Sequence, residues 1–157
     1  MNPMEPFWAA LRFLTVLPVP RGVSAAPEVT GRSLLAYPLV GLVMGVGLVL
    51  AAGSTAWTAP PLQAALVVAV WAVLSGALHL DGLADSADAF LGGHGDANRT
   101  LSIMKDPRSG PAGVVAVTLV LLLKYAALAP AISWGALVAA PVSVFYTHLT
   151  LPTNSRF

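Results

Sequence analysis

Three aspartates lie within eight positions of the stretch HLDGLADSADAF, which covers residues 79 to 90. If this stretch is helical, Asp81, Asp85 and Asp88 stand at positions i, i+4 and i+7 and project from one face. Like charges at this spacing repel each other and destabilise a helix by about 0.2 to 0.5 kcal/mol per pair. A divalent cation bound between the carboxylates would make the same spacing favourable.

Magnesium suits this set of side chains, because carboxylate oxygens favour hard cations. Bound magnesium also keeps several waters and takes phosphate oxygens of a substrate as further ligands. Gly82 and the small residues beside the aspartates leave room for a bulky anionic ligand. The alternative is that Asp81 only caps a helix and that Asp85 and Asp88 are solvated loop residues. The spacing alone favours neither interpretation.

A second polar stretch, IMKDPRSGPAG at residues 103 to 113, contains Lys105 and Arg108 ahead of two glycines. Lysine and arginine bind phosphate, and glycines let backbone N–H groups approach the same anion. Taken alone, the stretch fits slightly better as a basic anchor on the cytoplasmic side of a membrane span. Together with the aspartates, it indicates phosphoryl-group chemistry at a bilayer surface, where positioning and charge neutralisation do most of the work.

The elements that must position these residues are membrane helices. Hydrophobic residues make up 57% of the chain and charged residues 10%, whereas a soluble domain has about 25% charged residues. Full spans of about 20 apolar residues are expected at Leu34–Trp57, Leu62–Leu80 and Gly113–Leu128, the first two forming a hairpin. A partial fourth span begins near Ile132. The predicted fold is therefore an all-α, polytopic transmembrane helical bundle with three full spans and a partial fourth.

The N-terminal stretch EPFWAALRFLTVLPVPR is too short and too interrupted to cross, so we expect a helix that lies in the headgroup region. Basic residues precede the first predicted span and lie between the second and third, whereas the connection at 58–61 is uncharged. By the positive-inside rule, the N-terminus and the aspartate-rich segment are both cytoplasmic. Lys124 falls inside the third span, where an ionisable group needs either a partner or a route to the interface for its amine.

Composition also excludes several classes of protein. The formal net charge of +1 provides no basic face for nucleic acid, so none is expected as a partner. The absence of cysteine excludes disulfides, thiolate nucleophiles and cysteine-type zinc sites. His79 is expected to point away from the aspartate face and His94 to lie in a turn.

Four stretches together resemble the cobalamin synthase family, the adenosylcobinamide-GDP ribazoletransferases: FLTVLPVPR, YPLVG, HLDGLADSADA and IMKDPRSGPAG. They occur in order between Phe7 and Leu128. The resemblance implies a multi-pass enzyme of the bacterial inner membrane that requires magnesium. It implies transfer of the cobinamide-phosphate moiety of adenosylcobinamide-GDP to alpha-ribazole, or to its 5'-phosphate, with release of GMP.

The resemblance also assigns roles to residues. Asp81, Asp85 and Asp88 would be catalytic and would hold magnesium on the diphosphate, while Lys105 and Arg108 would contact phosphate oxygens. Asp106 would be a further metal ligand or would orient Arg108. The general base is not identified, and the aspartates are the leading candidates. Lys124 falls where the family tends to have a lysine. The chain departs from the family at Ala89 and Pro107, where a glycine and a small polar residue are usual.

The family runs to roughly 250 residues, so this chain of 157 is expected to hold an incomplete transferase domain at 1–142. Residues 143–157 break the apolar pattern and are interpreted as a non-native tail. The partners expected are the two substrates and the lipid bilayer, and the sequence leaves open a monomer or a homo-oligomer. The competing functions are a small transporter or channel subunit with an Asp/Lys ion pathway, and an inactive membrane anchor or assembly factor. The aspartates follow a span instead of lying inside one, which favours the enzyme.

Overall fold

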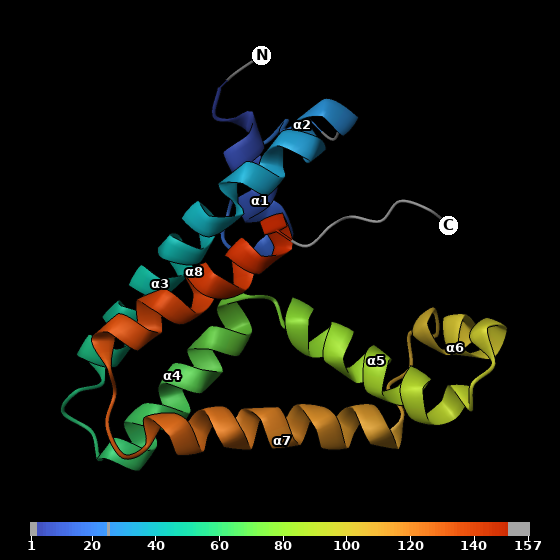
Figure 1. The fold of residues 1–157 in the computed structure, drawn as a ribbon. Coiled ribbons are helices and arrows are strands. Elements are labelled where there is room, and N and C mark those ends of the chain that lie inside the picture. The colour runs from blue at the N-terminus through green and yellow to red at the C-terminus, as the bar shows by residue number, and fades with distance from the viewer. Residues whose placement is uncertain (1–2, 25, 151–157) are drawn as a thin grey trace.

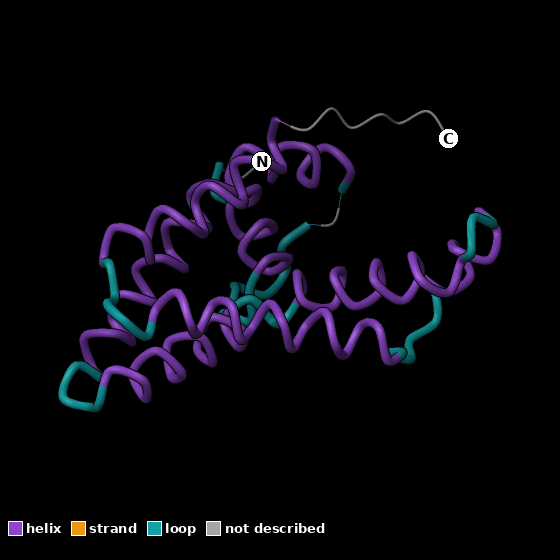
Figure 2. The backbone as a smooth tube through the Cα atoms, turned by 60° about the horizontal axis from the view of Figure 1, so that its bottom comes forward, coloured by secondary structure: helices purple, strands orange, loops and turns teal. Residues whose placement is uncertain are grey.

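The computed structural model describes residues 3–24 and 26–150, and no strand occurs in these ranges. The helices follow in the order α1 (Glu5–Leu14), α2 (Pro27–Ser33), η1 (Leu34–Ala36), α3 (Tyr37–Ser54), α4 (Pro60–Leu74), α5 (Leu78–Gly93), α6 (Ala97–Met104), α7 (Pro111–Leu128) and α8 (Trp134–Thr150). In Figure 1, α3 and α8 lie side by side in one arm, and α5, α6 and the start of α7 form a second arm. Figure 2 shows the same helical chain from another side. The all-α prediction is confirmed.

Two helical stretches are long and apolar enough to cross a membrane, Pro27–Ser54 and Pro111–Leu128. They confirm that the first and third predicted spans exist; the third agrees within two residues, whereas the first stretch begins seven residues earlier and ends three residues earlier than predicted. The predicted hairpin is present as well, because α3 and α4 pack against each other after a short connection. These lengths and compositions fit a membrane helical bundle.

The second predicted span, Leu62–Leu80, is wrong as a straight helix. The chain is helical in α4, breaks, and resumes as α5 at an angle of 85°. Gly76 and Ala77 both have left-handed backbone angles, with φ of +57° and +56°. Two successive left-handed residues cannot continue a right-handed helix, although the sequence there remains apolar. Residues 3–24 and 26–150 therefore contain two helical stretches long and apolar enough to span, or three if the bent pair counts as one.

The N-terminal segment supports this bend. The break frees the carbonyl of Leu74 at the end of α4, and the backbone N–H of Val16 donates to it at 3.0 Å. The last carbonyl groups of a helix have no partner within the helix, and here a segment some sixty residues earlier provides one. α1 itself is helical as predicted, and it buries Ala10, Leu11 and Leu14 in one hydrophobic cluster with residues of α3. Its position in a headgroup layer stays a prediction.

α8 packs along α3 at two glycines that the sequence analysis did not use. A Cβ atom at Gly41 would lie 2.8 Å from the carbonyl oxygen of Pro141, and one at Gly45 would lie 2.7 Å from Cα of Val138. The two glycines are four residues apart, in the small-residue pattern that brings membrane helices into close contact. The predicted partial fourth span is therefore a helix in contact with the first span.

The predicted tail falls partly within the described residues. Positions 143–150 continue α8, and 151–157 lie outside the part of the chain that the structure describes. The non-native origin of this tail stays a prediction.

Candidate active site

The aspartates lie on α5, so the expected helix over this motif is confirmed. Asp81 is in its first turn and is exposed, whereas Asp85 and Asp88 are partly buried. α5 packs between α6 and the beginning of α7. The spacing of the three aspartates places their carboxylates on one face of α5, as the sequence predicts.

Asp88 joins α5 to the start of α7. One of its carboxylate oxygens accepts the backbone N–H of Gly110 at 2.7 Å, and the other accepts that of Gly113 at 2.9 Å. The first N–H groups of a helix have no partner within the helix, and the positive end of the helix dipole favours a negative charge there. Asp88 therefore caps α7 from a different helix.

Gly110 and Gly113 make this contact possible. A Cβ atom at either position would lie 2.5 Å from a carboxylate oxygen of Asp88, and at Gly113 it would also lie 2.9 Å from the carbonyl oxygen of Ala84. From the sequence, these glycines are expected to open the backbone to a phosphate. In the structure, the anion that their N–H groups bind is Asp88 itself.

Asp81 and Asp85 differ from Asp88 in their contacts. Neither side chain forms a hydrogen bond or ion pair with another residue in the described ranges. In the same ranges, no group of three or more histidine, cysteine, aspartate or glutamate side chains is arranged to hold a metal ion. The predicted set of three carboxylate ligands is not gathered here, because Asp88 is directed at the backbone of α7. Metal binding by these aspartates stays a prediction.

The basic segment lies between α6 and α7 and is exposed to solvent. Asp106 holds Arg108 through two side-chain hydrogen bonds, Nε to Oδ1 at 3.0 Å and Nη2 to Oδ2 at 2.9 Å. These bonds from Arg108, together with the one from its backbone N–H, lower the pKa of the Asp106 carboxyl. Of the two roles that the resemblance suggested for Asp106, the structure contains the one that orients Arg108. Lys105 is exposed at the end of α6.

The two halves of the predicted site are therefore joined only in part. Asp88 connects the aspartate helix to the end of the basic segment at Gly110. No hydrogen bond or ion pair in the described part of the chain links Lys105 or Arg108 to Asp81 or Asp85. The two segments meet at Asp88, but within the described residues no set of hydrogen bonds or ion pairs joins all five side chains.

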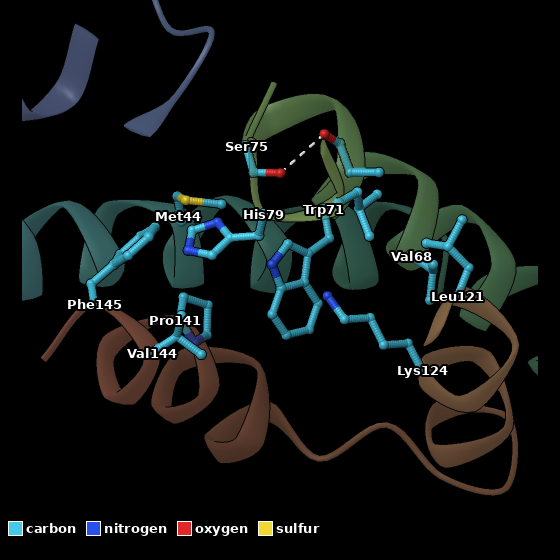
Figure 3. Close-up of a pocket in the computed structure, with 12 residues that line it drawn as sticks. Met44, Val68, Trp71, Ser75, His79, Leu121, Lys124, Pro141, Val144 and Phe145 are labelled. Atoms are coloured by element: carbon cyan, nitrogen blue, oxygen red, sulfur yellow. Dashed lines mark hydrogen bonds between the residues drawn. The ribbon is translucent and has the colours of Figure 1, made fainter. Parts of the chain in front are cut away.

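Lys124 has a partner that the sequence analysis missed. Its Nζ lies 4.1 Å from the ring centroid of Trp71, a cation–π contact between α7 and α4 (Figure 3). Trp71 lies within an apolar run of the sequence, and nothing in that run indicates a pairing with a lysine. His79 lines the same cavity, with its ring 5.5 Å from the ring of Phe145, and its orientation relative to the aspartates stays a prediction (Figure 3).

These elements define a class of protein: an all-helical membrane protein. Its carboxylates lie beside the start of a spanning helix, and a basic loop leads into that helix. A family model described as Cobalamin-5-phosphate synthase matches residues 6–153, so the chain belongs to that family. The match includes part of the predicted tail.

Relatives include adenosylcobinamide-GDP ribazoletransferases from several pseudomonads. The Pseudomonas putida protein is 62% identical over 125 residues, covering 80% of this chain and 52% of the relative. The Pseudomonas aeruginosa protein is 54% identical over 143 residues, covering 91% of this chain and 58% of the relative. The chain spans somewhat more than half the length of these relatives. No solved structure is similar to it.

Proposed function

We propose that this chain carries the aspartate-containing part of an adenosylcobinamide-GDP ribazoletransferase, which moves cobinamide phosphate from adenosylcobinamide-GDP to alpha-ribazole or its 5'-phosphate. An acceptor hydroxyl oxygen bonds to the cobinamide-side phosphorus, the bond from that phosphorus to the bridging oxygen breaks, and GMP leaves with the bridging oxygen. The acceptor's proton passes to a base. The observation that carries the proposal is the family membership of the chain over residues 6–153, together with two unengaged carboxylates on α5.

We place Asp81 and Asp85 at the donor's diphosphate, with magnesium as the cofactor. Their oxygen donors fit magnesium, which is commonly held by one or two carboxylates plus substrate phosphates, so a third carboxylate is not required. When bound, the ion would neutralise the diphosphate and the departing GMP. Asp88 keeps α7 and the preceding loop in place. Lys105 and Arg108 contact phosphate oxygens from that loop, with Arg108 oriented by Asp106.

The location follows from the same elements. We propose a multi-pass protein of the bacterial inner membrane whose N-terminus and α5–α7 loop face the cytoplasm, where a nucleotide-linked donor is found. The basic residues around that loop support this orientation.

The test measures magnesium-dependent GMP release in detergent. It uses the full-length Pseudomonas putida relative, with the aspartate aligned to Asp85 changed to alanine, and this chain with Asp85→Ala. We expect the substitution to lower GMP release by at least about 100-fold, as for loss of a group that stabilises transition-state charge. Glu28→Gln, an exposed carboxylate far along the chain, serves as the control and should leave the rate unchanged. Equal product from the Asp85→Ala and unaltered proteins would refute the site assignment.

A further inference from the structure

A cavity lies at the corner where α4 bends into α5 and where α3, α7 and α8 meet it. Its volume is about 150 Å³, and its lining includes Met44, Trp71, Ser75, His79, Leu121 and Lys124. The wall from α8 includes Val144 and Phe145, which fall in the stretch interpreted above as a tail. Figure 3 shows the indole of Trp71 and the imidazole of His79 facing this space, with the lysine side chain reaching in from α7. We call it the corner cavity.

The corner cavity contains a cation in apolar surroundings. Lys124 is half-buried on a helix that is long enough to span the membrane. No carboxylate of the described residues forms an ion pair with it, and its contact is with the ring of Trp71. Ionisable residues inside membrane segments usually serve a substrate or another charge. The corner cavity is therefore suited to an anionic group.

The remaining lining suits a flat ring. Apolar cavities of about 150 Å³ accept a ring of the size of benzene. The ring of His79 already lies 5.5 Å from that of Phe145, so the indole of Trp71 is the aromatic surface against which a further ring would pack in this space. Ring and charge together indicate a ligand with an apolar aromatic base and an anionic group, and not a free inorganic anion.

The corner cavity also lies next to the proposed reaction site. His79 and Leu80 line it, and Asp81 is the next residue along α5. Helical side chains lean toward the N-terminus of their helix, so the amine of Lys124 extends back along α7, toward the end that Asp88 holds. A ligand in the corner cavity would therefore be adjacent to the first carboxylate of the donor site.

We infer that the corner cavity is the acceptor subsite, in which Trp71 packs against the aromatic base of the acceptor nucleotide and Lys124 pairs with its 5'-phosphate. This inference rests on the proposed function. It assigns the acceptor to the bend between α4 and α5, whereas the donor's diphosphate lies at Asp81 and Asp85. Lys124 is then a specificity residue, which distinguishes a phosphorylated acceptor from alpha-ribazole.

The test is a binding measurement on this chain in detergent, without magnesium or donor. Alpha-ribazole 5'-phosphate, alpha-ribazole and ribose 5-phosphate are titrated while tryptophan fluorescence is recorded. We expect the phosphorylated nucleotide to bind more tightly than either fragment. Trp71→Phe should abolish the fluorescence change, since the three other tryptophans lie outside the cavity lining.

Variants at Lys124 test the charge. Lys124→Met should weaken binding of the phosphorylated nucleotide by about tenfold or more, as expected for loss of a charge-assisted hydrogen bond, and should leave alpha-ribazole unaffected. Lys124→Arg should keep most of the preference, which shows that a folded cavity remains available. Arg21→Met removes one exposed positive charge elsewhere and should change neither affinity.

Three results would overturn the inference: an unchanged preference for the phosphorylated acceptor in Lys124→Met, an undiminished fluorescence change in Trp71→Phe, or equal competition by an alkyl phosphate that mimics a lipid headgroup. Binding and turnover are separate measurements. Binding as expected without GMP release would contradict the proposed reaction alone, and GMP release without binding in the corner cavity would contradict this inference alone.

Discussion

Asp88 shows how one carboxylate of an acidic motif can differ in role from its neighbours. All three aspartates share a helical face, but Asp88 lies opposite the first turn of α7 and accepts two backbone hydrogen bonds there. Asp81 and Asp85 lie nearer the bend, and in the described structure neither carboxylate accepts a backbone hydrogen bond. The position along α5, and not the residue type, therefore distinguishes Asp88, which caps α7, from Asp81 and Asp85, which are proposed to bind a ligand.

We expect Asp88→Ala to loosen the start of α7. Two hydrogen bonds to a charged group are lost, each contributing about 1.5 to 3 kcal/mol, so the amides of Gly110 and Gly113 should exchange with solvent at least tenfold faster. Hydrogen exchange followed by mass spectrometry on peptides covering 108–114 measures this. Asp85→Ala is the matched control on the same helical face. Unchanged protection in Asp88→Ala, or an equal loss in both variants, would show that Asp88 does not cap α7.

The sequence predicted the residue types of the site better than their contacts. Spacing alone placed Asp81, Asp85 and Asp88 on one face, because helical geometry is local. It could not predict that Asp88 would bond to amides 22 and 25 positions later, because this contact depends on how α5 and α7 fold back on each other. The same reason explains why Trp71 was missed as the partner of Lys124.

At the scale of elements, hydropathy located the helices but not the break between α4 and α5. Residues 75–77 are small and uncharged, so the apolar run continues through them. The bend depends on backbone angles at Gly76 and Ala77, for which an alanine gives no sequence signal. By contrast, the glycines at 41 and 45 were a readable signal for close helix packing, since a small residue every fourth position recurs at membrane helix interfaces.

We expect Gly45→Ala to separate α3 from α8. The added methyl group would overlap the backbone of Val138, and overpacking of this kind costs about 1 to 3 kcal/mol. Thermal unfolding in detergent, followed by circular dichroism, should show a lower midpoint. Gly53→Ala is the control, because the same helix has open space at that position. If both variants unfolded at the same temperature, the close α3–α8 contact would be contradicted.

At the scale of the whole molecule, α7 is the most exposed of the spanning helices, with 6% of its most apolar stretch buried within the protein. Leu119, Leu122 and Leu123 are among the large apolar side chains exposed on it. Such a surface is too apolar for water and fits lipid or further protein around the helix. The family model covers most of this chain, whereas the chain covers somewhat more than half of its relatives.

The lack of cysteine allows a direct test of the membrane arrangement. We expect Ala59→Cys, in the α3–α4 connection, to react with an impermeant maleimide from outside intact spheroplasts. Ser109→Cys should react only after the membrane is permeabilised, and Leu123→Cys should react in neither case because lipid covers it. Denatured samples give the maximum labelling of each variant. Labelling of Leu123→Cys at the rate of Ser109→Cys would show that α7 is in water.

The backbone bond from Val16 to Leu74 carries a practical consequence for anyone producing this protein. Val16 lies two residues beyond α1, so this bond ties the segment after the first helix to the corner at which the acceptor is proposed to bind. A fusion or affinity tag that displaces the first helix is therefore expected to weaken acceptor binding before donor binding.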